Sequence, residues 1–223
     1  MTDDSGNNRE KQVGEKELAF FGAITASVSH ELNNVISIID QTAGLLQDLL
    51  AGAHEGQPIP NERLQRIADS VAAQTDRGVR IIKRLNTFAH SVDDPVKEFE
   101  INPTVENLVA LARRFASLKR VELEAELPDP SPKVTNSPFR VQQALFTCLR
   151  YMLDGSKPGD KIVVSAKTSL DSVSIVIEGP VSIRAEQTDF DHLRVVADRI
   201  GGKLELPADS EHARFVLTLP VNP

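Results

Sequence analysis

The sequence predicts an α+β protein in which an N-terminal antiparallel helical hairpin precedes a two-layer α/β sandwich. Two observations predict this class. Before residue 92, apolar residues recur at alternating steps of three and four over two long segments, which is the period of packed helices. After residue 100, shorter helical patterns interleave with segments in which apolar and polar residues alternate, as they do in half-buried strands.

The first long helix is predicted from about Glu15 to Leu50, a segment without proline. Eight of its ten heptad positions are large and apolar, which indicates a helix that packs along most of its length. These positions are Leu18, Phe21, Thr25, Val28, Leu32, Val35, Ile39, Thr42, Leu46 and Leu49. Residues 1–14 are polar and hold almost nothing to bury, so they are predicted to be a disordered tail.

A second heptad run follows a turn at residues 51–61 and extends from Leu64 to Phe88. The two runs make residues 15–92 an antiparallel hairpin. A two-helix hairpin cannot enclose a core by itself, so we expect two copies to dimerise as a four-helix bundle. The alternative is that the remainder of the chain covers the apolar face of the hairpin.

A charged connection around Pro95 separates the hairpin from a second domain at residues 100–223. Within it, Asn102 is the predicted N-cap of a helix whose first residue is Pro103. A mostly antiparallel sheet is expected, with a loop at 129–138 and a C-cap at Gly201-Gly202. The predicted helices are 103–118, 139–153 and 190–200, and the predicted strands are 121–127, 161–168, 172–178, 203–206 and 213–219.

Composition excludes several classes of protein. The chain has 25 Lys and Arg against 32 Asp and Glu, a net charge of −7, with 4% aromatic residues and no Trp, so we expect no nucleic-acid partner. Its one cysteine, Cys148, excludes an intramolecular disulfide and fits a reducing cytoplasm. No apolar run reaches the roughly 20 residues of a membrane span. We therefore expect a cytoplasmic protein.

Candidate chemistry lies on the first helix, in the segment Ser29-His30-Glu31-Leu32-Asn33-Asn34. His30 occupies the heptad position that points furthest from the apolar face, and Asn34 lies one turn further on. A neutral imidazole is a competent nucleophile towards phosphorus, and a neighbouring carboxylate such as Glu31 can orient the ring and accept its other proton. Taken alone, such a histidine is more often an ordinary surface residue.

The segment from Phe20 to Asn34, followed by the hairpin, resembles the dimerisation and histidine-phosphotransfer domain of two-component sensor kinases. That family carries a His-Glu-x-x-Asn/Thr box, matched here by His30, Glu31 and Asn34, with Val35 replacing the usual proline. The resemblance implies that His30 is phosphorylated, that Glu31 assists as a base, and that Asn34 could orient water for dephosphorylation of a partner's aspartate. It covers residues 15–92 and continues collinearly from 100 to 220.

The second domain is similar to the ATP-binding domain of the same kinases, but the nucleotide-binding residues differ. Tyr151 replaces the Asn that holds magnesium in the family, and only Glu178-Gly179 remains of the Asp-x-Gly-x-Gly run that reads adenine. Residues 181–191 lack a Gly-rich lid, and no Gly-x-Gly occurs among the 12 glycines. Backbone amides therefore cannot surround phosphates as nucleotide loops require.

These features predict a dimeric histidine phosphotransferase, similar to the ChpT type, that passes a phosphoryl group between response-regulator receiver domains through His30. No cofactor is expected on this chain, and magnesium is expected on the partner receiver. Two alternatives stay open: a divergent kinase that still binds ATP, or a non-catalytic scaffold or phosphatase that binds a receiver.

Other polar residues carry weaker signals. Arg77, Arg80, Lys83 and Arg84 form a basic stretch that is either a solvated helix face or a surface for an acidic partner. The remaining histidines have no metal-ligand spacing, and Cys148 is expected in the core. These histidines are His54, His90, His192 and His212.

Overall fold

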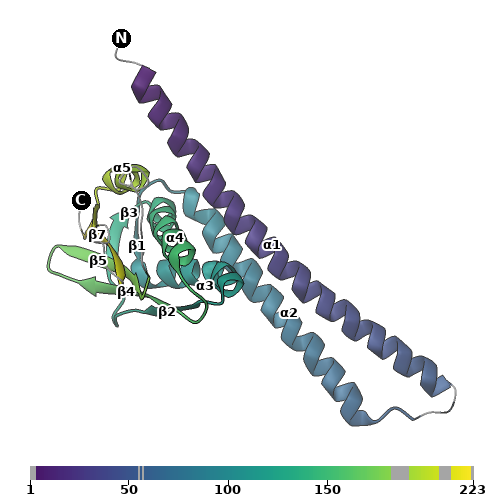
Figure 1. Cartoon of the computed structure of the whole chain (residues 1–223). Helices are drawn as coiled ribbons and strands as arrows, with labels where there is room; N and C mark the ends of the chain where they lie inside the picture. Colours follow the sequence, from purple (N-terminus) through teal and green to yellow (C-terminus); the bar gives the residue numbers. More distant parts are fainter. Residues whose placement is uncertain (1–3, 55, 57, 182–190, 206–211, 222–223) are drawn as a thin grey trace. The chain divides into compact units, whose positions relative to one another are not determined.

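A computed structural model describes residues 4–54, 56, 58–181, 191–205 and 212–221 (Figure 1). The chain divides into two compact units. One unit is helical and comprises Thr25–Asn86, whereas the other combines Met1–Ile24 with Thr87–Pro223 and contains the sheet. The predicted combination of a helical N-terminal region with a following α/β domain is therefore confirmed.

The helical unit is formed by the antiparallel helices α1 (Asp4–His54) and α2 (Asn61–Ala89). Val28 and Val35 of α1 are buried, as are Ile67 and Ile81 of α2. These four are heptad positions, so the period of three and four predicted this part of the contact face. Two other predicted heptad positions, Leu18 and Leu64, are exposed instead. No described helix is both long enough and apolar enough to cross a bilayer.

Helix α1 begins at Asp4, which corrects the prediction of a disordered tail through residue 14. The segment 4–14 contains no proline and includes good helix formers such as Arg9, Glu10 and Gln12. Adding residues to an existing helix avoids the cost of nucleation, so a polar segment can continue a helix that packing stabilises further along. The predicted tail also includes residues 1–3, which lie outside the described residues.

The α/β unit is built on a five-stranded sheet with strand order β2-β4-β5-β7-β6. Among the described strands, β2 and β4 pair in parallel and the other neighbours pair antiparallel, so the prediction of a mostly antiparallel sheet is confirmed. Alternate residues are buried along the central strands, as in Val173, Ile175 and Ile177, which gives the sheet one core-facing side. The strands are β2 (Glu122–Glu126), β4 (Lys161–Thr168), β5 (Ser172–Gly179), β6 (Lys203–Glu205) and β7 (Ala213–Pro220).

Three helices pack on the core-facing side of this sheet, namely α3 (Ile101–Lys119), α4 (Pro138–Gly155) and α5 (Asp191–Arg199) (Figure 1). Helix α4 is the most buried of the three, and Ser137 caps it by accepting a hydrogen bond from the Arg140 amide. Its core residues include Cys148, which is 1% exposed and confirms the core position predicted for this thiol. The three helices match their predicted ranges closely.

A two-stranded ribbon was missed by the sequence prediction: β1 (Lys97–Glu100) pairs antiparallel with β3 (Lys133–Asn136). Because β1 runs directly into α3, the N-cap of that helix is Glu100, and the predicted cap at Asn102 was wrong. The segment just before β3 supplies the partners that a cap would provide. Pro132 accepts from the Ile101 amide, and the Ser131 hydroxyl accepts from the Asn102 amide.

Within the α/β unit, aromatic rings connect the first part of α1 and the end of α2 to α4. Phe20 of α1 packs against Phe88 of α2 and against Phe139 and Phe146 of α4, with centroids 5.0–5.5 Å apart. Phe88 is fully buried. The α/β unit therefore includes the first part of α1 and the end of α2. The domain boundary predicted at residues 92–100 was placed where the sequence pattern changes.

Candidate functional site

The predicted site residues lie together on α1 within the helical unit. His30 and Asn34 are exposed, and Glu31 is half-buried. Residues four apart on a helix are neighbours on one face, about 6 Å apart between Cβ atoms, so the imidazole and the amide share a patch open to solvent. The structure thus brings His30 and Asn34 together as predicted.

Packing on the opposite face of α1 fixes this orientation. Val28 and Val35 are 2% and 3% exposed, and they flank His30 by two residues before it and five after it. Gly78 of α2 is buried beside Val35, and a Cβ built on it would lie 3.5 Å from Val35 Cγ1. The two helices approach closely at this level, so α1 holds the His30 side chain on a rigid support.

The His30 ring is available to a partner molecule. Among the described residues it has no hydrogen-bond or ion-pair partner. The neighbouring Ser29 hydroxyl donates to the Thr25 carbonyl at 2.9 Å instead of to the ring. His30 and Glu31 are adjacent in sequence and point in different directions on the helix, so the structure shows no hydrogen bond between them.

The described histidines other than His30 are not grouped as metal ligands. His54 ends α1, and the His90 Nδ1 atom lies 2.7 Å from Asp93 Oδ2 in an exposed pair. In the described part of the chain, no group of three or more His, Cys, Asp or Glu side chains is placed to hold a metal ion.

The basic stretch of α2 lies at the surface. The side chains of Arg77, Arg80, Lys83 and Arg84 are all exposed. They form a positively charged part of the helical unit.

At the positions that bind nucleotide in the kinases that this sequence resembles, this chain has different side chains. Tyr151 is a half-buried residue of α4. Glu178, at the end of β5, pairs with Arg214 of β7, with 3.5 Å between Oε2 and Nε. A Cβ on Gly179 would lie 2.9 Å from the Lys161 carbonyl oxygen, so this glycine is required by strand packing. The predicted absence of a lid concerns residues 182–190, which lie outside the described residues.

Solved structures show what fold this is. The catalytic domain of histidine kinase ThkA has a TM-score of 0.52 and 15% identity, and the match covers 57% of this chain and 98% of that one. The α/β unit has a histidine-kinase-like fold. Histidine kinase AdeS of Acinetobacter baumannii matches 87% of this chain and 98% of its own, with a TM-score of 0.51 and 16% identity.

The kinase-like chain also has a distant relative among sensor proteins. It is 26% identical over 146 residues to the C4-dicarboxylate transport sensor protein DctB of Pseudomonas aeruginosa. This match covers 66% of the chain, which spans 23% of the length of that curated relative. No protein-family model matches the chain.

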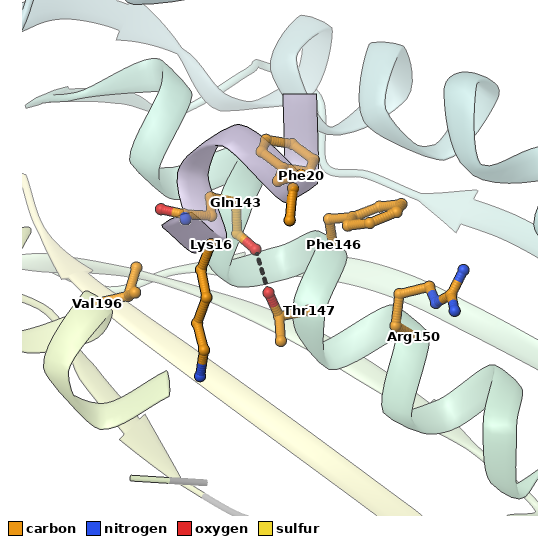
Figure 2. Close-up of a pocket in the computed structure, with 8 residues that line it drawn as sticks. Lys16, Phe20, Gln143, Phe146, Thr147, Arg150 and Val196 are labelled. Carbon is orange, nitrogen blue, oxygen red and sulfur yellow. Dashed lines mark hydrogen bonds between the residues drawn. The ribbon is translucent and has the colours of Figure 1, made fainter. Parts of the chain in front are cut away.

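The α/β unit has a pocket, shown in Figure 2, that was not predicted from the sequence. Lys16 and Phe20 of α1 line it together with Gln143 and Arg150 of α4. The lining residues of α1 lie more than a hundred residues from those of α4 in sequence, and no local pattern marks residues that meet only through tertiary packing.

Proposed function

We propose that this chain is a histidine phosphotransfer protein of a two-component phosphorelay. His30 accepts a phosphoryl group from the aspartyl phosphate of one response-regulator receiver domain and passes it to another, without ATP. The observation that carries the proposal is the exposed His30 ring, which has no partner among the described residues. It lies on a helical hairpin that continues into a kinase-like α/β unit, where other residues occupy the nucleotide positions.

The chemistry of the step suits the site. A lone pair on one ring nitrogen of His30 attacks phosphorus, a P–N bond forms, and the P–O bond to the receiver's aspartate breaks as its carboxylate leaves. Glu31 accepts the proton of the other ring nitrogen, or shares it in a hydrogen bond, when partner docking turns the two side chains towards each other. Magnesium held by the acidic pocket of the receiver would neutralise the phosphoryl oxygens.

The nucleotide positions support transfer without ATP. Phosphoryl transfer from ATP depends on a metal ion and on donors that surround the phosphates. Tyr151 offers a phenol where the family has an amide ligand, and the Glu178 carboxylate already faces the Arg214 guanidinium. The phosphoryl donor is therefore expected to be another protein.

The proposed partner class is supported by the resemblance and by one solved complex. Histidine kinase ThkA has been solved in complex with the response regulator protein TrrA, and that structure matches 98% of this chain and 65% of its own, with a TM-score of 0.50 and 14% identity. A receiver domain carries an acidic pocket, and the exposed Arg77 and Arg80 side chains of α2 would attract such a surface. We expect the receiver to contact the helical unit around His30.

A homodimer is part of the proposal, because the helical unit leaves large apolar side chains at its surface. Ile36 is 61% exposed, and Leu45, Val79 and Ile82 are each more than 40% exposed. A second copy would cover these side chains in a four-helix bundle. Light scattering should report twice the chain mass, and Ile36→Glu with Ile82→Glu should yield monomer, whereas Ser37→Glu at an exposed polar position should not.

The deciding experiment supplies a phosphorylated receiver domain and follows label on this chain. Wild type should become labelled, and His30→Asn should lose the label by more than about a hundredfold, since no other nucleophile takes its place. His54→Asn, at another exposed histidine of α1, is the matched control and should label normally. Label that persists in His30→Asn would refute the assignment.

Radiolabelled ATP distinguishes the divergent kinase from the phosphotransferase. If this chain accepts phosphoryl groups from receiver domains and not from ATP, radiolabelled ATP without a receiver should leave His30 unlabelled. Calorimetric titration with Mg-ATP should then show no saturable heat. Autophosphorylation of His30 would instead favour the kinase.

Phosphatase action is a second candidate function, favoured by the exposed Asn34 amide one turn from His30. An amide at this place could orient water towards the aspartyl phosphate of a docked receiver. Asn34→Ala should then slow decay of the receiver phosphate while His30 labelling continues. Normal decay in Asn34→Ala would remove the water-orienting role.

A further inference from the structure

The α/β unit contains a pocket of about 300 Å³ between the N-terminal part of α1, α4 and α5 (Figure 2). We propose that this pocket binds a small amphipathic anion, with an apolar ring system inside the pocket and one acidic group at its rim. The volume is at the lower end of the range for small-molecule sites. The lining residues are Lys16, Ala19, Phe20, Gln143, Phe146, Thr147, Arg150 and Val196.

The walls of the pocket are apolar and fixed. Phe20, Phe146 and Val196 are each less than 10% exposed. The rings of Phe20 and Phe146 lie 5.0 Å apart between centroids, and further rings hold both of them: Phe88 and Phe139 pack on Phe20, and Phe115 packs on Phe146. An aromatic or aliphatic ring would therefore gain apolar contact without rearranging the walls.

Two cations give the pocket its charge preference. Lys16 and Arg150 are the charged residues of the lining, and neither forms an ion pair with another described residue. The Lys16 side chain runs along the pocket in Figure 2. Partial burial lowers the pKa of Lys16, so its ammonium group is incompletely solvated and would gain from an anion. The Arg150 guanidinium lies over Phe115, with its central carbon 5.2 Å from the ring centroid, and in Figure 2 it points away from Lys16. It therefore adds positive charge at a different side of the pocket from Lys16.

One polar group of the lining lacks a partner. Gln143 is 3% exposed, and its Oε1 atom is buried without a hydrogen-bond partner among the described residues. A buried acceptor in this state costs stability, and rotation of the amide would present it to an N–H or O–H of a ligand. Thr147, by contrast, is satisfied, because its hydroxyl donates to the Gln143 carbonyl at 2.8 Å.

The same lining is unsuited to a polyphosphate. A nucleotide needs several backbone amides or a metal ion at its phosphates, whereas this pocket offers two side-chain cations beside mainly apolar walls. The expected ligand therefore carries one negative charge. The proposal does not rest on phosphotransfer by His30, which lies in the other unit.

Calorimetric titration of the full chain with 2-naphthoate tests the pocket. We expect saturable binding with one site per chain, and weaker binding of the uncharged isostere 2-naphthamide. Arg150→Gln and Lys16→Gln should each weaken binding of 2-naphthoate about fivefold or more, because a charge-assisted contact is lost. Arg63→Gln, at an exposed position of α2, is the control and should leave the affinity unchanged.

Variants with larger side chains test whether the ligand binds in this pocket. Ala19→Trp fills the pocket from the exposed side of α1 and should abolish binding, as should Val196→Phe from α5, whereas Ala26→Trp outside the pocket should not. Circular dichroism checks that each variant is folded. The proposal is overturned by absence of saturable binding, by binding that survives Ala19→Trp in a folded variant, by equal affinity for the amide, or by displacement with ATP.

Discussion

The Glu178 carboxylate faces the Arg214 guanidinium across paired strands, with 3.5 Å between Oε2 and Nε. The two residues lie directly opposite each other in the antiparallel ladder of β5 and β7. In the sensor kinases that the sequence resembles, the corresponding end of the strand recognises adenine. In this chain the acid is engaged by a cation from the neighbouring strand.

Removal of the Glu178 carboxylate should therefore have little effect on phosphotransfer. For Glu178→Ala we expect His30 labelling by a phosphorylated receiver to stay within about twofold of wild type. Both side chains of the pair are partly exposed, so the loss of stability should be at most about 1 kcal/mol. A tenfold loss of labelling would show that Glu178 contributes to the transfer site.

Gly179 should behave as a packing residue. In Gly179→Ala, the added Cβ would lie 2.9 Å from the Lys161 carbonyl oxygen and 3.4 Å from Met152 and Ile162, and a backbone oxygen cannot move aside cheaply. We expect a loss of about 1–3 kcal/mol in the free energy of unfolding, measured by urea denaturation. Gly22→Ala, where nothing lies within 4 Å, is the control and should not destabilise the chain. Unchanged stability of Gly179→Ala would contradict the packing role.

Gly78 tests how closely the hairpin helices pack. Gly78→Ala should raise stability by about 0.5–1 kcal/mol, because alanine favours the helix and its Cβ would make an ordinary 3.5 Å contact with Val35. Gly78→Leu should lower it, since a larger side chain would force α1 and α2 apart. Thermal unfolding followed by the helical circular dichroism signal, at fixed protein concentration, measures both. Stabilisation by leucine would mean that the contact is looser than the structure indicates.

Cys148 should be unreactive in the folded protein. Its side chain is 1% exposed, and burial raises the pKa of the thiol well above its ordinary value. A disulfide reagent such as DTNB should react with the native chain more than about a hundredfold more slowly than with the urea-unfolded chain. An increase from pH 7 to 9 should accelerate only the unfolded reaction, because the buried thiol stays protonated. Rapid stoichiometric reaction of the native protein would contradict this.

Much of the fold could be predicted because its strands and helices carry a local pattern. The alternation at Val173, Ile175 and Ile177 marks a half-buried strand in any context, and the two-glycine stop after residue 200 ends α5 where expected. The β1–β3 ribbon could not be found in this way. Its strands are only four residues long, β1 is mostly charged, and the two strands pair across a separation of more than thirty residues.

For the candidate site, the sequence predicted the positions of the side chains, whereas their role has not been tested. His30, Glu31 and Asn34 sit within five residues of one helix, so the 3.6-residue turn alone places His30 and Asn34 on one outer face. Their role in phosphotransfer stays a prediction, because it depends on a partner protein.

Local periodicity was sufficient to specify the hairpin, the alternating strands and the outward imidazole, since each depends on neighbours within a turn or two of backbone. Tertiary packing decided the rest. It set Glu178 against Arg214 and Phe20 against Phe88, and it brought Lys16 and Arg150 to the lining of one pocket, although these residues come from distant parts of the chain. Such contacts depend on how whole helices and strands dock to bury their apolar faces, and no short stretch of residues encodes that geometry.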